Sequence, residues 1–195
     1  PFPLPELGLE RAFVVGGGYK YCQLGEGNGF LRLPPGCRLR PAITGWFAEF
    51  AELSAPAPGQ VAYGDGPVRF AGATYDPTSH YRAAEVFDFF ERHELTPAML
   101  RQVSQHQVGV LIEAFDSLDL APGIAQRDRS VPVSTLGGFL CIETRHAERL
   151  NAALFERGVY TDYRGEILRF GPAPYLSDQQ LRDAMAALGE ATEEL

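Results

Sequence analysis

Apolar positions along the chain follow two rhythms, and each rhythm predicts a different kind of element. Short apolar runs at residues 12–15 and 29–33 are bounded by glycine or proline, which predicts buried strands that end in tight loops. Residues 34–68 are rich in proline, glycine and alanine. There we expect an extended excursion over a surface.

Helical periodicity starts at Ser79, where an apolar stripe runs up to His93. The phenylalanine-rich faces of this segment, near Phe87 and Phe90, are expected to be core. Thr96 and Pro97 then predict the N-cap and first position of a second, long helix, which runs to about residue 118. A polar loop is expected at residues 121–132.

The C-terminal stretch alternates short strands and helices. We expect strands at 137–142, 159–160 and 167–170, and helices at 146–157 and 178–190. Gly158 is expected to stop the first of these helices, and Ser177 to cap the second. The resulting β-α-β-β-α order predicts a small α+β domain.

These elements predict an α/β fold in three parts. Residues 1–95 are expected to belong to a larger domain, residues 96–136 to form a long bridging helix and its loop, and residues 137–195 to form the small α+β domain. A large sheet needs more strands than the first part holds. We therefore expect sequence that precedes residue 1 to complete it.

Composition narrows the function classes. The formal net charge is −8 (17 basic against 25 acidic residues), which argues against nucleic acid or an anionic membrane as a partner. No apolar run approaches a membrane span, and residues 1–5 lack the regions of a signal peptide. The cysteines Cys22, Cys37 and Cys141 are few and scattered, which indicates a reducing, cytoplasmic setting. The four histidines are dispersed as well, so we expect no metal site.

One cation stands out. Lys20 is the only lysine among 17 basic residues, and it follows a strand end and a glycine run, between Tyr19 and Tyr21. An arginine-rich genome would explain the scarcity of lysine. Alternatively, Lys20 carries chemistry that arginine cannot perform, because an amine forms a Schiff base and a guanidinium does not. For that role we expect Lys20 to be fixed near the sheet rim and partly desolvated.

Further motifs each have two interpretations, one as a binding site and one as a purely structural feature. The run Gly25–Gly29 would cradle a phosphate with its backbone amides, or form a flexible turn. Trp46, the only tryptophan, would cover a cofactor or offer its indole N–H to a phosphate, or anchor a core or interface.

Two more motifs lie further along the chain. Thr74 and Asp76 precede a helix and would meet a phosphate or substrate, or form an ordinary turn. Arg169, on a strand that leads into a rigid proline-rich loop, suits bidentate binding of a carboxylate. Its structural alternative is a surface ion pair.

Taken in order, these motifs resemble those of a known enzyme group. The chain is similar to the C-terminal half of a fold-type-I pyridoxal-phosphate enzyme of the class-V aminotransferase group, and within it to kynureninase. The resemblance rests on Tyr19-Lys20-Tyr21, on Gly45-Trp46 and on the run from Gly158 through Asp162 and Arg169 to Tyr175. It covers nearly the whole chain.

The resemblance implies pyridoxal 5'-phosphate as the cofactor, bound by the large-domain part of the fold. Lys20 would hold it as a Schiff base and act as base or proton shuttle. Tyr19 would hydrogen-bond the phosphate or relay a proton. Trp46 and Thr74 would hold the phosphate of the neighbouring subunit, which implies a homodimer.

The resemblance also assigns substrate residues. Arg169 would bind the α-carboxylate of a small-molecule amino acid. Asp76 stands where the family has an asparagine that recognises the aryl part of its substrate. The reaction implied is hydrolytic cleavage of the β–γ carbon–carbon bond of kynurenine or a related amino acid, with release of alanine.

Three alternatives stay open. One is transamination. Another is a lyase or cysteine desulfurase reaction, for which neither Cys22 nor Cys37 is clearly the reactive cysteine. The third is a fragment, or one half of a split enzyme, that is inactive alone. In this case another segment would bring the family's stacking aromatic, phosphate loop and pyridine-pairing aspartate.

Overall fold

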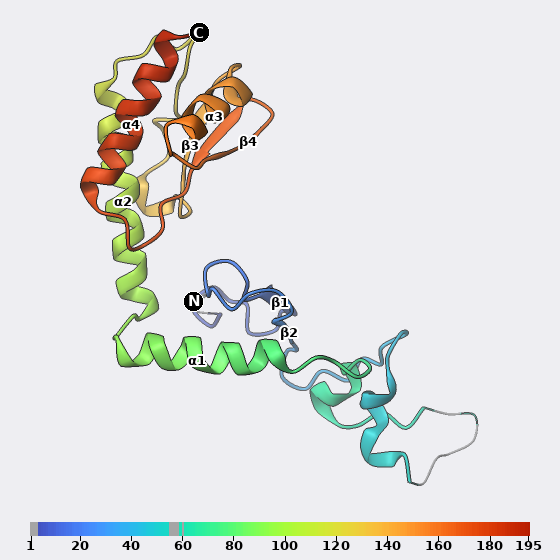
Figure 1. Ribbon diagram of the computed structural model, residues 1–195. Coiled ribbons are helices and arrows are strands. Elements are labelled where there is room, and N and C mark those ends of the chain that lie inside the picture. The colour runs from blue at the N-terminus through green and yellow to red at the C-terminus, as the bar shows by residue number, and fades with distance from the viewer. Residues whose placement is uncertain (1–3, 55–58, 60) are drawn as a thin grey trace. The chain divides into compact units, whose positions relative to one another are not determined.

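The computed structural model describes residues 4–54, 59 and 61–195. The chain divides into two compact units, Pro1–Leu95 and Thr96–Leu195 (Figure 1). Two predicted segments lie partly outside the described residues: the N-terminal stretch without signal-peptide regions (residues 1–3) and the expected excursion (residues 55–58 and 60). The further division of the chain into a large-domain part, a bridge and a small domain remains a prediction.

In the first unit, the two strands predicted near the N-terminus pair with each other. β1 (Val14–Gly17) and β2 (Gly29–Arg32) form an antiparallel two-stranded sheet. Gly17, the last residue of β1, lies opposite Gly29, the first residue of β2. The loop between the strands, which carries Lys20, therefore leaves and re-enters the sheet at paired positions.

The excursion after β2 is less extended than its composition predicts. It contains two short 3-10 helices, η1 (Trp46–Glu52), which is kinked at Glu49, and η2 (Gly66–Phe70). Pro67 lies in the first turn of η2, where its fixed φ suits a helix start. In η1 the Trp46 ring stacks on Phe47, with their centroids 4.6 Å apart. Aromatic packing and a favourable proline thus form turns where composition alone indicated open chain.

Helix α1 (Thr78–Arg92) forms where the periodicity predicts it, but the core assignment of its phenylalanines is wrong. Phe87 is 52% exposed and Phe90 is only half-buried. The buried side chains of α1 are Ser79 and Ala83. Periodicity shows which side chains share a helix face, whereas burial depends on whether another element covers that face.

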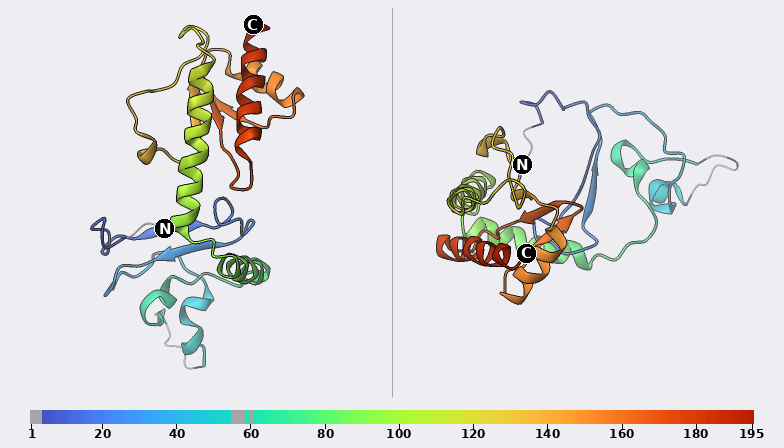
Figure 2. Two further views of the ribbon diagram at one scale, coloured as in Figure 1. Left: turned by 90° about the vertical axis from the view of Figure 1, so that its left-hand side faces the viewer. Right: turned by 90° about the horizontal axis from the view of Figure 1, so that it is seen from above.

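The second unit has the predicted β-α-β-β-α order after a long first helix (Figure 2). Its elements are α2 (Pro97–Ser117), the short turn η3 (Val133–Thr135), β3 (Leu140–Glu143), α3 (Ala147–Glu156), β4 (Asp162–Arg164), β5 (Ile167–Phe170) and α4 (Asp178–Glu193). The strands form an antiparallel sheet in the order β3-β5-β4. Helices α2 and α4 lie side by side in both views (Figures 1 and 2).

One hydrophobic core holds this unit together. Its residues come from α2, β3, α3, β5 and α4, and from Ala125 in the loop before β3. Its largest fully buried members are Leu111, Ile142, Leu150, Leu154, Leu168, Met185 and Leu188. The predicted bridging helix is therefore part of the core of the C-terminal unit, because Val110, Leu111 and Phe115 pack in the same cluster.

The two predicted N-caps of this unit are confirmed. The Thr96 hydroxyl oxygen accepts a hydrogen bond from the Met99 amide at 3.2 Å. Ser177 and Gln180 form a capping box, in which the Ser177 amide donates to Gln180 Oε1 at 2.9 Å. Within the described residues, none of the helices combines the length and hydropathy that a membrane crossing requires.

The predicted strand at residues 159–160 is wrong. Gly158 adopts φ 76°, and the Val159 amide donates to the Leu154 carbonyl at 2.9 Å. That bond closes the C-terminal end of α3, as in a helix ending with a left-handed glycine. Because the Val159 amide is used in this way, strand pairing starts three residues later, at Asp162.

The polar loop after α2 is tied to the end of that helix by an ion-pair cluster. Arg127 Nε donates to Asp116 Oδ1 at 2.9 Å, and Arg129 Nη2 lies 3.0 Å from the same oxygen. The Arg127 guanidinium holds the pKa of the Asp116 carboxyl below its usual range. The side chain of Arg127 is only 13% exposed, so this pair is shielded more than a typical surface pair.

This cluster predicts an acid-sensitive contribution to stability. A carboxyl with a lowered folded pKa stabilises the fold above its unfolded pKa of about 3.9, and the effect is lost as pH falls through the folded value. Urea unfolding between pH 6 and pH 3 should show a shallower loss of stability for Asp116→Asn than for the parent. In an Arg127→Gln background this difference should shrink. An equal slope for parent and Asp116→Asn would contradict the assignment.

Adjacent positions on α3 test the core. Leu154 is fully buried, whereas Phe155 is 60% exposed. Leu154→Ala should lower the free energy of unfolding by about 2–5 kcal/mol, because it opens a cavity in the core. Phe155→Ala removes more atoms, yet it should cost about 1 kcal/mol or less, the scale of the Phe155–Tyr160 edge-to-face contact. Urea denaturation followed by circular dichroism measures both, and equal losses would contradict this packing.

Candidate functional site

The loop that carries Lys20 is closed by backbone hydrogen bonds. The Gly18 amide donates to the Asn28 carbonyl at 2.8 Å, and the Leu24 amide donates to the Gly18 carbonyl at 2.9 Å. Leu24 is buried, and a Cβ on Gly18 would lie 2.3 Å from Leu24 Cδ1, so a larger residue at position 18 would displace the Leu24 side chain. The loop therefore has one compact path from β1 to β2.

Lys20 projects from this loop into solvent. Its side chain is exposed, with Nζ 5.8 Å from the centroid of the Tyr19 ring, and Tyr19 is itself 54% exposed. The expected partial desolvation of Lys20 is thus wrong for this arrangement of the chain. The two-stranded sheet fixes the loop but provides no apolar wall around the amine.

The glycine-rich run after Lys20 contacts the start of α1. The Ser79 hydroxyl donates to the Gly27 carbonyl at 3.1 Å, and the Asn28 amide group donates to the Ser79 carbonyl at 3.5 Å. Gly25 and Gly27 have φ of 72° and 86°, values that favour glycine. These contacts are those of a turn packed on a helix, the structural alternative for this run.

Two of the expected phosphate-binding residues lie together. The Trp46 indole Nε1 donates to Thr74 Oγ1 at 3.3 Å. Two bonds align the flanking segments: the Phe47 amide donates to the Gly72 carbonyl at 3.2 Å, and the Thr44 hydroxyl to the Ala71 carbonyl at 3.0 Å. An N–H donor and a hydroxyl donor are thus brought side by side from positions 28 residues apart.

This pairing depends on a close backbone approach at Gly45. A Cβ at position 45 would lie 2.3 Å from the Gly72 carbonyl carbon and 2.3 Å from the Ala73 amide nitrogen. Both are backbone atoms, so neither moves aside as a flexible side chain would. The glycine before Trp46 is therefore a packing requirement of the two segments.

Asp76 serves the turn into α1. Its Oδ1 accepts hydrogen bonds from the Thr78 amide at 2.9 Å and from the Thr78 hydroxyl at 2.6 Å. The Thr78 hydroxyl and amide hold the pKa of the exposed Asp76 carboxyl below its usual range. These are the contacts of a turn residue, and the substrate role of Asp76 remains a prediction.

Arg169 lies on the central strand of the second unit, on the face opposite the core. Its neighbours Leu168 and Phe170 are buried, so alternation along β5 turns Arg169 the other way. The guanidinium donates to Asp162, from Nε to Oδ1 at 2.6 Å and from Nη2 to Oδ2. Its carbon lies 5.5 Å from the centroid of the Phe139 ring. The arginine is thus held between a carboxylate and an aromatic ring.

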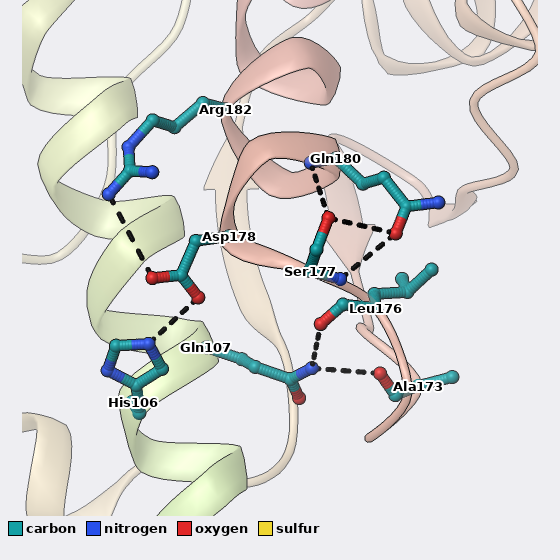
Figure 3. Close-up of polar contacts among 8 residues, drawn as sticks. All are labelled: His106, Gln107, Ala173, Leu176, Ser177, Asp178, Gln180 and Arg182. Carbon is teal, nitrogen blue, oxygen red and sulfur yellow. Dashed lines mark hydrogen bonds and ion pairs between the residues drawn. The ribbon is translucent and has the colours of Figure 1, made fainter.

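The loop that follows Arg169 is fixed from α2 (Figure 3). Gln107 is buried, and its Nε2 donates to the carbonyls of Ala173 at 2.9 Å and Leu176 at 3.1 Å. The preceding residue on α2 contacts the next helix: His106 Nε2 lies 2.8 Å from Asp178 Oδ1 at the start of α4. The proline-rich loop therefore owes its path to a buried amide rather than to its prolines alone.

Sequence reasoning missed two supporting residues. Gln107 is a polar residue among the buried apolar residues of α2, and such a position is itself a signal of a buried hydrogen-bonding partner. Asp162 entered only as part of the C-terminal motif. The signal for its pairing was available in principle, because residues seven apart across a short hairpin can lie opposite one another.

The candidate residues carry donors suited to a cofactor rather than to a metal ion. Among the described residues, no group of three or more histidine, cysteine, aspartate or glutamate side chains is arranged to hold a metal ion. Trp46, Thr74, Tyr19 and Lys20 supply an indole N–H, two hydroxyls and an amine. By residue type these donors fit an anionic cofactor with a phosphate and an electrophilic carbonyl, and they form two pairs, Tyr19 with Lys20 and Trp46 with Thr74.

The second unit is similar in sequence to a known protein domain. Residues 100–188 match the family model described as the kynureninase C-terminal domain. The second unit is kynureninase-like. The match begins within α2 and ends within α4, and so includes Arg169 and Asp162. It confirms the resemblance to the C-terminal half of a kynureninase-like enzyme.

Solved structures extend the likeness to the fold of the chain. A NifS-like protein matches with a TM-score of 0.57 and 13% identity, over 86% of this chain and 42% of that protein. The chain thus spans about two fifths of that structure's length. This match confirms the expected fold class, the C-terminal part of a pyridoxal-phosphate-dependent transferase fold. It covers more of the chain than the kynureninase-like second unit alone.

Aminotransferase structures also match, with lower scores. An adenosylmethionine-8-amino-7-oxononanoate aminotransferase from Methanocaldococcus jannaschii has a TM-score of 0.49 and 17% identity, over 75% of this chain and 32% of that one. A structure described as a transaminase with L-ala has a TM-score of 0.46 and 19% identity, over 60% of this chain and 28% of that one. A comparison with curated proteins found no match.

Within the first unit, the expected site residues form two pairs. Trp46 and Thr74 are hydrogen-bonded, and Tyr19 and Lys20 share one loop. In the described part of the chain, no hydrogen bond or ring contact joins Lys20 to Trp46 or Thr74.

Gly45 offers a direct test of the Trp46–Thr74 geometry. Gly45→Ala should force the two segments apart, with a loss of about 1–3 kcal/mol in unfolding free energy, the usual scale of overpacking. Trp46 is the only tryptophan, so its fluorescence reports the site without labels, and we expect changed emission.

Gly72→Ala is the matched control, since a Cβ there would meet nothing within 4 Å and should leave the spectrum unchanged. Equal spectra for both variants and the parent would show that Gly45 is not the point of close approach.

Proposed function

We propose that this chain is the C-terminal part of a pyridoxal-phosphate-dependent enzyme that acts on an amino acid in the manner of kynureninase. The reaction is hydrolytic: water and kynurenine, or a related amino acid, give an aromatic acid and alanine by cleavage of the β–γ carbon–carbon bond. The match of residues 100–188 to the kynureninase C-terminal domain carries the proposal. The transferase-type fold of the chain supports it.

The proposed cofactor residues come from the first unit. Lys20 would hold the cofactor's aldehyde covalently through its amine, and Tyr19 would donate a hydrogen bond to the phosphate or relay a proton. The Trp46 indole N–H and the Thr74 hydroxyl would donate to a phosphate as well. Their observed hydrogen bond supports a shared role, because it places the two groups next to each other, and the indole N–H would exchange Thr74 for the phosphate as its acceptor. When bound, the cofactor supplies an electron sink for charge that develops at the substrate α-carbon.

The remaining roles concern the substrate. Arg169 would bind the α-carboxylate, for which a planar guanidinium is well suited. The released Lys20 amine would take and return a proton at the α-carbon, as a general base does. Asp76 would contact the distal part of the amino acid. We further propose a homodimer, in which Trp46 and Thr74 serve the neighbouring subunit, and a cytoplasmic setting.

The alternative reactions of this fold are distinguished by their products. Kynurenine cleavage yields anthranilate, cysteine desulfuration yields sulfide, and transamination yields a keto acid. Cys22 is exposed on the Lys20 loop, but an exposed cysteine alone does not indicate a desulfurase. Assays for all three products on one preparation would identify the reaction.

Lys20 allows a clean test of the cofactor assignment. Incubation of the protein with pyridoxal phosphate should give a visible absorbance band, and borohydride should then fix the cofactor on the peptide that contains Lys20. Lys20→Ala should abolish both signals. Lys20→Arg keeps the charge but cannot form the covalent link, so it should lose both signals as well.

Because Lys20 is the only lysine, no other side-chain amine competes in the chain. A label on the chain's amino terminus in place of Lys20, or a band that survives Lys20→Arg, would contradict the assignment. Absence of any band for this chain alone, with a band in the protein expressed from its complete gene, would support the split or fragment alternative.

A further inference from the structure

Strand register places Asp162 and Arg169 directly opposite each other. They are paired positions of the antiparallel strands β4 and β5, so their side chains point to the same face of the sheet. That face lies opposite the core, since Leu168, next to Arg169, is fully buried. The pairing of these two side chains therefore follows from the register of the backbone.

The contact between them is a two-bond fork. Arg169 Nε and Nη2 donate to the two carboxylate oxygens of Asp162. A guanidinium has two edges that bind a carboxylate in this way, the Nε side and the edge formed by both Nη atoms. Asp162 occupies the Nε side, and this fixes both the plane and the direction of the guanidinium.

Neighbouring side chains define the rest of this environment. The Phe139 ring centroid lies 5.5 Å from the guanidinium carbon, and Cys141 is the paired position on β3, on the other side of Arg169. A row of Cys141, Arg169 and Asp162 thus crosses all three strands. Arg169 is the central member of the row, between an uncharged thiol position and a carboxylate.

The pair contributes more to orientation than to stability. The side chains of Arg169 and Asp162 are 26% and 61% exposed, and ion pairs this open to water contribute little to folding. Arginine, however, loses much rotamer freedom when it binds a ligand. A partner that already restricts those rotamers lowers the entropy cost of binding.

We propose that Asp162 is a positioning residue, which holds the Arg169 guanidinium in the orientation that receives the α-carboxylate of the amino-acid substrate. The inference rests on the proposed function, in which Arg169 binds that carboxylate. Asp162 acts through Arg169 and does not contact the substrate. Without it, the guanidinium samples other rotamers, and substrate binding must restrict them.

The experiment uses the protein expressed from its complete gene and loaded with pyridoxal phosphate. L-alanine, the amino acid released in the proposed reaction, is titrated while the visible spectrum is followed. Asp162→Asn should weaken L-alanine binding by about tenfold, the upper end of the cost of ordering one side chain. L-alaninamide lacks the carboxylate, so its binding should be unchanged. A purely structural defect would weaken both ligands.

Glu166→Gln is the matched control. Glu166 is an exposed acid on the same hairpin, and its substitution removes the same charge as Asp162→Asn. It should leave L-alanine binding unchanged. Arg169→Lys should weaken L-alanine binding on its own, and Asp162→Asn should add little in that background, because coupled residues give non-additive effects.

Cys141 gives a second readout that needs no bound cofactor. Burial raises the pKa of the Cys141 thiol most, Arg169 lowers it and Asp162 raises it. With Cys22 and Cys37 replaced by serine, Asp162→Asn should therefore shift alkylation of Cys141 to lower pH. An unshifted profile would place Asp162 outside this row and overturn the inference.

The binding outcomes separate the two proposals. Weaker L-alanine binding in both Arg169→Lys and Asp162→Asn supports both. If only Arg169→Lys weakens binding, Asp162 does not position the arginine, and the proposed carboxylate role of Arg169 stands. Tighter binding in Asp162→Asn would show that Asp162 competes with the substrate, which also overturns the inference. If Arg169→Lys has no effect, the carboxylate role fails, and the inference fails with it.

Discussion

Side chains alternate between the two faces of the central strand β5, and the kynureninase-like unit depends on this alternation. Leu168 and Phe170 lie in the core with residues from α2, α3 and α4. Arg169, between them, lies on the opposite face with Asp162 and Phe139. Packing on one face thus fixes the position of the chemical group on the other. The backbone at Arg169 is held by a closed core, although the site itself is open to solvent.

The first unit positions its residues by a different means. Its described buried apolar residues are few (Leu24, Ala48 and Ala83), so close backbone approaches take the place of a core. Leu24 packs against Gly18 below the Lys20 loop, and Gly45 lies against the backbone of Gly72 beside Trp46. Glycine acts here by leaving room, and in neither approach does the glycine need a positive φ. Local fit rather than buried area holds the candidate cofactor residues.

The sequence predicts local structure well where the signal is itself local. Thr96 and Ser177 cap their helices as expected, since a cap involves residues only three positions away. The errors concern burial. Phe87 and Lys20 are exposed, and the sequence did not predict this because no periodicity or motif reports what covers a side chain. The role of Asp162 required strand register, which depends on the length of the turn at Gly165. The resemblance to kynureninase supplied residue roles that patterns alone left open.

The turn between β4 and β5 limits how the length of this hairpin can vary. Arg164 pairs with Ile167, so only Gly165 and Glu166 connect the two strands. A one-residue insertion that shifted register would turn every side chain of a strand to the other face. Arg169 would then enter the core, and Leu168 would face water. A change of register at this hairpin would therefore disturb the core and the face that carries Arg169 at the same time.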